Sequence, residues 1–92
     1  MIKLVRLSSG EELIGDVKET PDGITLSDAI ILIPAGEGKI GFMPFMPYTE
    51  ASDGISISNK FIVFMVKPVQ NLIDSHREAT GKIALPPSSI IL

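Results

Sequence analysis

The stretch ELIGDVKETPDGITLSDAIILI at residues 12–33 decides the fold, because it contains two strand-like segments joined by a turn. In residues 12–20, apolar or glycine positions alternate with polar ones, as in an antiparallel strand with one exposed face. TPDG at 20–23 is a strong turn signal, since proline presets its own φ and Gly23 tolerates a positive φ. Residues 24–33 predict a second, more apolar strand. The stretch therefore predicts a β-hairpin.

Two positions predict that this hairpin is not flat. Gly15 lies in the middle of the first strand, where a missing side chain allows a sharp bend. The apolar pattern of the second strand changes register near Asp28, which indicates a β-bulge. A strongly bent hairpin favours a sheet that curls into a small barrel.

Outward from the hairpin, the flanking segments also have the character of strands. Residues 2–7 precede it, and residues 40–48 and 55–67 follow it after the loop PAGEGK. Five strands with short connections predict an antiparallel meander over about residues 2–67. We expect an all-β fold of this kind, a small bent five-stranded antiparallel barrel, followed by a C-terminal helix.

The helix is predicted over about residues 68–80, because one stripe of that segment carries apolar residues and the single histidine of the chain: Val69, Leu72, Ile73 and His76. A C-terminal tail at 81–92 is apolar but is interrupted by two adjacent prolines. With 92 residues and no composition change along its length, the chain predicts a single domain over 1–92.

The segment FMPFMP at residues 42–47 is an unusual strand, since a proline has no N–H to donate to a neighbouring strand. The two prolines predict that the segment is bent, bulged or at a sheet edge. Three aromatic residues nearby are candidates for stacking on nucleic-acid bases: Phe42, Phe45 and Tyr48. The alternative, which the usual burial of such residues favours, is that they fill the core or an interface.

The run FIVFMV at 61–66 is apolar on both faces if it forms a regular strand. The barrel interior covers one face, and the short helix and tail offer little to cover the other. Full burial of each such side chain is worth roughly 1.5–3 kcal/mol, so an exposed face of this kind marks a subunit interface. The predicted oligomer interface is the whole run: Phe61, Ile62, Val63, Phe64, Met65 and Val66.

Composition excludes several classes of protein. The net charge of −3 weighs against a strongly basic nucleic-acid binder. The absence of cysteine excludes disulfides, thiolate chemistry and a cysteine-rich zinc site. The N-terminus becomes polar too early for a signal peptide, and the longest apolar run is far shorter than the roughly 20 residues of a membrane helix. We expect a soluble protein with no membrane partner.

Catalytic motifs are weak in this sequence. A nucleophile pair or a metal site would need His76, but its place on the apolar stripe favours a packed side chain. GEGK at 36–39 fails as a phosphate-binding loop, because isoleucine follows the lysine where serine or threonine is needed. We therefore expect no enzyme activity, no metal site and no cofactor.

The segment IKLVRLSSGEELIGDVKETPDGITLSDA at residues 2–29 resembles the first motif of the Sm-like (LSm/Hfq-type) proteins, most closely the small ones of marine cyanophages. ISNKFIVFMVKP at 57–68 is similar to the second motif and its closing strand. The resemblance implies a bent barrel, edge-to-edge assembly into a homo-oligomeric ring of about five to seven subunits, and RNA binding. It also implies the cytoplasm of an infected host cell.

The family's base-binding residues differ here. Gly23 stands where the family has asparagine, and Ser58-Asn59 replaces an arginine-glycine pair. We expect non-catalytic binding of nucleic acid, RNA rather than DNA, in phage-related RNA or DNA processing. The candidate contacts are the aromatic residues above together with loop-end residues that a ring would repeat around its axis: Lys39, Asn59 and Lys60. The alternative is a ring-shaped structural or adaptor protein that binds other proteins, which the acidic charge and the lost base-binding residues favour.

Overall fold

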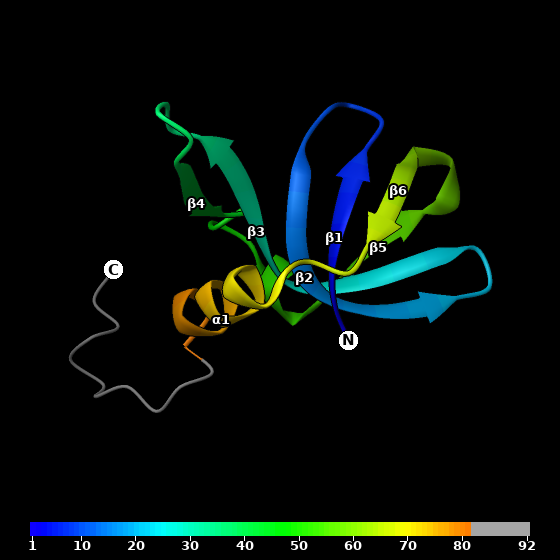
Figure 1. Cartoon of the computed structure of the whole chain (residues 1–92). Coiled ribbons are helices and arrows are strands. Elements are labelled where there is room, and N and C mark those ends of the chain that lie inside the picture. The colour runs from blue at the N-terminus through cyan, green and yellow to red at the C-terminus, as the bar shows by residue number, and fades with distance from the viewer. Residues whose placement is uncertain (82–92) are drawn as a thin grey trace.

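The computed structural model describes residues 1–81, which form one antiparallel sheet and a C-terminal helix (Figure 1). The strands are β1 (Ile2–Leu7), β2 (Glu12–Thr20), β3 (Gly23–Pro34), β4 (Ile40–Pro44), β5 (Ile55–Ser58) and β6 (Ile62–Val66). The helices are the short 3-10 helices η1 (Glu50–Asp53) and η2 (Asn59–Phe61) and the α-helix α1 (Gln70–Ala79). The predicted mostly-β fold with a C-terminal helix is confirmed.

The sheet is built around β3, its longest strand. The strand order is β4-β3-β2-β1-β6, and β5 pairs with β3 outside this path. β4 pairs with the end of β3 at residues 30–34, whereas β5 pairs with its start at residues 23–26. β4 and β5 therefore follow each other along the same edge of β3, separated by residues 45–54.

The predicted small five-stranded barrel is wrong in two respects: over residues 1–81 the sheet has six strands, and it does not close. β4 and β6 are the two ends of the pairing path, and β5 pairs with β3 rather than with β6. The prolines explain part of this result, because β4 ends at Pro44 and the connection to β5 contains Pro47. The predicted strand at 40–48 is thus shorter than expected and lies at an edge.

The predicted bend of the β2–β3 hairpin is confirmed. Ile14 pairs with Ile30 and Asp16 pairs with Ser27, so two residues of β3 lie opposite the single residue Gly15. Asp28, in this bulge, has a φ of 52°. A Cβ on Gly15 would lie 2.8 Å from the Ser27 carbonyl oxygen, so the close approach of the two strands requires glycine.

Gly23 has a different role from the predicted one. Its φ is not positive, and it is the first residue of β3 rather than a turn residue with left-handed backbone. A Cβ at this position would overlap the carbonyl oxygen of Ile57 on β5. Glycine is therefore needed for strand pairing and not for the turn.

The core lies in the concave side of the bent sheet. It consists of buried aliphatic side chains from the three central strands: Val5, Leu13, Val17, Ile24, Leu26 and Ala29. Half-buried side chains from β5 and β6 pack against it, among them Ile57 and Met65. The aliphatic composition of the chain thus gives a small core supplied mainly by β1, β2 and β3.

Helix α1 lies beside the lower part of the sheet in Figure 1, and it confirms the helix predicted at 68–80 with slightly narrower bounds. His76 is 2% exposed, and its Nε2 lies 2.8 Å from the carbonyl oxygen of Asp28 in the β3 bulge. This contact joins the helix to the sheet. Leu72 and Ile73 are half-buried, whereas Val69 is exposed. Of the predicted tail at 81–92, only Gly81 lies within the described residues.

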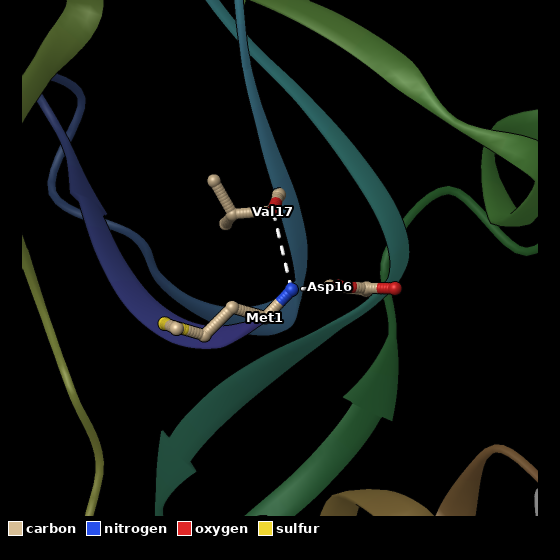
Figure 2. Close-up of polar contacts among 3 residues, drawn as sticks. All are labelled: Met1, Asp16 and Val17. Carbon is tan, nitrogen blue, oxygen red and sulfur yellow. Dashed lines mark hydrogen bonds and ion pairs between the residues drawn. The ribbon is translucent and has the colours of Figure 1, made fainter.

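The chain start extends the pairing of β1 with β2 by one residue. The α-amino nitrogen of Met1 lies 2.5 Å from Oδ1 of Asp16 and 3.3 Å from the Val17 carbonyl oxygen, as Figure 2 shows. The Val17 N–H in turn donates to the Met1 carbonyl oxygen at 2.9 Å. Both charged groups of the ion pair are mostly exposed, so its contribution to stability is small.

Candidate functional site

The two ends of the sheet carry large apolar side chains that face solvent. On β4 these are Ile40, Phe42 and Met43, and on β6 they are Val63, Phe64 and Val66. In a water-soluble sheet, an unpaired apolar edge invites pairing with another chain. Both edges have this character, so each is a candidate surface for association.

The FIVFMV run does not alternate as a regular strand would. Its first residue belongs to η2, and the register with β1 shifts between Arg6 and Leu7, which places Val63 in a bulge. Ile62 and Met65 pack against the core, while Val63 is 59% exposed. The core therefore covers one face of the run, and within the described residues the other face stays largely uncovered.

An open groove of about 930 Å³ lies between β5, η2 and the end of β1. Its apolar lining consists of Leu7, Phe45, Met46, Ile55, Ile57 and Phe61. Its remaining lining consists of serines: Ser8, Ser9, Ser56 and Ser58. No lining residue carries a charge, which is unusual on a chain with 21% charged residues.

Backbone hydrogen bonds fix the walls of this groove. The Ser8 N–H donates to the Phe61 carbonyl oxygen at 2.8 Å, which joins the β1–β2 turn to η2. The Phe45 N–H donates to the Ala29 carbonyl oxygen at 3.0 Å, which holds the opposite wall to β3. The groove is therefore part of the folded sheet rather than a gap between loops.

The β1–β2 turn beside the groove is held by a side-chain hydrogen bond. The Ser9 hydroxyl donates to the Glu11 carboxylate. This hydrogen bond, together with one from the backbone N–H of Glu11, lowers the pKa of the Glu11 carboxyl. The Ser9 proton is thus used inside the turn, and its oxygen remains able to accept a hydrogen bond.

Asn59 and Lys60, two of the predicted nucleic-acid contacts, lie together in η2 and are exposed. The Lys60 N–H donates to the Ser58 hydroxyl oxygen at 3.2 Å, so the 3-10 turn has a serine cap. The Asn59 N–H donates to the Asp22 carbonyl oxygen at 2.9 Å. The β2–β3 turn and η2 are therefore neighbours.

The other predicted contacts lie elsewhere. Lys39 is in the β3–β4 loop, and Figure 1 shows this loop and the β5–β6 connection on opposite sides of the β1–β2 hairpin. Phe42 is on edge strand β4, and Tyr48 is 98% exposed in the turn before η1. Phe45 packs against the core and lines the groove. The six residues thus form no single cluster in the described part of the chain.

The groove was not predicted from the sequence. Its serines come from two segments far apart in the sequence, and only the alternation ISIS at 55–58 signals a strand with an apolar and a hydroxyl face. Phe61 was assigned to the oligomer interface alone, although it also lines the groove. Hydrogen bonds that join distant segments have no local sequence signal.

Metal-binding groups and the single histidine can be compared with their predicted roles over residues 1–81. These residues contain no group of three or more histidine, aspartate or glutamate residues arranged to hold a metal ion. His76 is buried against the sheet, as its place on the helix stripe predicts. No helix in the described range is both long and apolar enough to cross a bilayer.

No protein-family model matches the chain, and no curated protein is detectably similar to it.

Proposed function

We propose that the protein is a non-catalytic Sm-like binding protein that assembles edge to edge into a homo-oligomeric ring. The observation that carries this proposal is the pair of unpaired apolar edges at the two ends of the sheet, β4 and β6. Strand pairing between β4 of one copy and β6 of the next satisfies the free backbone groups of both edges. It also removes exposed side chains such as Met43 and Phe64 from water.

The two edges differ in sequence, so their contact is heterologous. A heterologous contact leaves one free β4 edge and one free β6 edge after each addition. Repetition of the same contact closes a ring when the rotation between neighbours divides a full turn. A ring of about five to seven copies is the arrangement that the Sm-like resemblance implies.

The proposed ligand is single-stranded nucleic acid, RNA rather than DNA, within phage-related RNA or DNA processing. Asn59 and Lys60 supply an amide and a cation on an exposed turn. A ring repeats this pair once in each subunit, so one lysine becomes a circle of positive charge that contacts phosphates. Lys39 forms a second, separate circle on the β3–β4 loop.

The second candidate function is a ring-shaped adaptor that binds other proteins. The net charge of −3 and the uncharged groove favour it, because neither attracts phosphate. The two candidates share the same assembly and differ only in the ligand.

The experiment that tests the proposal has two measurements. Light scattering of the purified chain is expected to give a mass several times that of the 9.9 kDa subunit. Titration with labelled single-stranded RNA and DNA at about 50 and 200 mM salt is expected to show binding that weakens as salt rises. A monomer contradicts the assembly, and the absence of salt-dependent binding contradicts the nucleic-acid ligand and leaves the adaptor.

Lys60→Gln tests the proposed site against a matched control. Lys60 lies in η2, whereas Lys67 is also exposed but lies just beyond the other end of β6. Lys60→Gln is expected to weaken binding and to reduce the salt dependence by about one unit of slope for each phosphate that no longer meets a lysine. Lys67→Gln is expected to change neither. Equal effects of both variants would mean that positive charge promotes binding wherever it lies, and that η2 is not the binding site.

A further inference from the structure

We infer that the uncharged groove between β5, η2 and the β1–β2 turn binds the chain's own C-terminal segment, residues 82–92. This inference goes beyond the proposed ring and its ligand, since it assigns an occupant to a surface that neither uses. It stands on the chemistry of the groove, the sequence of the segment and the length of that segment.

The groove is suited to an uncharged occupant. Its lining combines apolar side chains, with Leu7, Ile55 and Phe61 among them, and serine hydroxyls. A phosphate-bearing ligand placed there would lose hydration without gaining a cation, because no lysine or arginine lines the groove. An apolar peptide loses little favourable hydration on entering the groove, and its binding removes the apolar surfaces of both peptide and groove from water.

The serines fit the backbone of such a peptide. An extended peptide presents N–H and C=O groups that need partners when they leave water. The Ser58 oxygen accepts from the Lys60 N–H, which leaves the Ser58 hydroxyl proton available to a peptide carbonyl. Ser8 and Ser56, which also line the groove, each offer both a donor and an acceptor.

The chain carries a segment of matching chemistry at its end. KIALPPSSIIL at 82–92 has one charged side chain, Lys82, and ends in three large aliphatic residues. Pro86 and Pro87 disfavour a helix across its middle, so the proposed binding mode is that of an extended peptide.

The segment is also long enough. Fully extended, residues 82–92 span at most roughly 36 Å, and the longest dimension of the molecule is 39 Å. Because this span is close to that dimension, the segment is long enough to extend from Gly81 across most of one molecule.

The test uses engineered cysteines in the full-length chain, which has none of its own. The double variant Ser56→Cys with Ile91→Cys places one thiol in the groove lining and one in the terminal aliphatic residues. A disulfide requires the two Cα atoms to approach within about 7 Å. The matched control is Ala35→Cys with Ile91→Cys, because Ala35 is exposed in the β3–β4 loop, away from the groove.

The expected result is disulfide formation at least about tenfold faster for the Ser56 pair than for the Ala35 pair under mild oxidation, since docking raises the local thiol concentration. An intrachain band and a dimer band on a non-reducing gel both support the inference. Equal rates for the two pairs overturn it. Circular dichroism checks folding, and Ser8→Cys replaces Ser56→Cys if that variant does not fold.

A protection measurement separates the segment from a nucleic-acid occupant. The single thiol of Ser56→Cys is expected to react more slowly with maleimide than the same thiol in a chain that also carries Ile91→Asp. If Ile91→Asp does not change the rate of the maleimide reaction, but an added RNA oligonucleotide slows it, the groove binds nucleic acid and the inference is overturned. The disulfide and maleimide results do not depend on the mass of the oligomer or on Lys60, so a failure of this inference can be distinguished from a failure of the proposed function.

Discussion

The β2–β3 hairpin and the outer strands β4 and β6 are built from the same kinds of side chain but use them in opposite ways. Leu13 and Leu26 in the hairpin are completely buried. Met43 on β4 and Val66 on β6 are each nearly half exposed. Residue type therefore does not distinguish the two regions, whereas position in the strand order does.

This difference separates what holds the subunit together from what it offers to partners. Each hairpin strand has neighbours on both sides, so its backbone groups are paired and its inner face is covered. The outer strands have one neighbour each within the described residues. Substitutions in the hairpin should lower the free energy of unfolding, and substitutions at the edges should change association.

The largest expected effect comes from a methyl group added where two strands nearly touch. Gly23→Ala places a Cβ against the Ile57 carbonyl oxygen and should separate β3 from β5, lowering the free energy of unfolding by about 3 kcal/mol. Gly41→Ala on edge strand β4 is the control, since its Cβ would meet the nearest atom at 3.6 Å. It should change stability by less than about 0.5 kcal/mol. Urea unfolding followed by circular dichroism measures both, and equal losses would contradict the contrast between centre and edge.

A charged side chain introduced at either edge should weaken the proposed association rather than the stability of the folded chain. Met43→Lys on β4 or Val66→Lys on β6 would place an unpaired ammonium in the proposed contact, at a cost of at least about 2 kcal/mol per contact. The oligomer should dissociate while the subunit keeps its circular dichroism spectrum. Light scattering over a concentration series measures the change.

Val69→Lys is the control for these edge variants. Val69 is at least as exposed as either residue but is the N-cap of α1 and belongs to neither edge strand. If the mass measured by light scattering also falls in Val69→Lys, an added surface charge is enough to cause dissociation, whatever its position.

A smaller effect is expected from the contact between helix and sheet. His76→Leu replaces the imidazole by an apolar side chain that can stay buried, but it removes the donor to the Asp28 carbonyl oxygen. The free energy of unfolding should fall by about 1–2 kcal/mol. His76→Gln retains an N–H donor and should recover part of the loss. Hydrogen exchange should show the loss mainly in α1. Unchanged protection of α1 in His76→Leu would mean that apolar packing alone holds the helix.

The smallest effect is expected at the chain start. Asp16→Asn removes the ion pair with the Met1 amino group, but both groups are mostly exposed, so stability should fall by less than about 0.5 kcal/mol. The difference should shrink further in high salt. Urea unfolding at low and high salt measures it, and a loss comparable with that of His76→Leu would show that this contact anchors β1.

The hairpin could be predicted from sequence because its signals are local. The alternation of residues 12–20, the bend at Gly15 and the register change at Asp28 all lie within a few residues of their effects. The prolines of β4 likewise predict a segment that is bent, bulged or at an edge, and the strand lies at an edge. These features depend on backbone geometry that neighbouring residues determine.

The open sheet, the role of Gly23 and the groove could not be predicted in this way. Gly23 is needed because β5, more than thirty positions later, comes close to it. The bulge at Val63 depends on how β6 meets β1, which its own apolar run does not encode. Residue type and position in the sequence do not show that the loops of Lys39 and Lys60 lie on opposite sides of the β1–β2 hairpin.

The tandem arrangement of β4 and β5 along β3 has a consequence for how the molecule tolerates change. Because the sheet resumes its pairing after residues 45–54, this connection interrupts one edge without altering the register of any other strand. Its tip, next to Tyr48, projects into water. A foreign epitope or reporter peptide inserted at this point should be displayed at the surface while the strands of the sheet keep their pairing, so the connection is a suitable site for insertions.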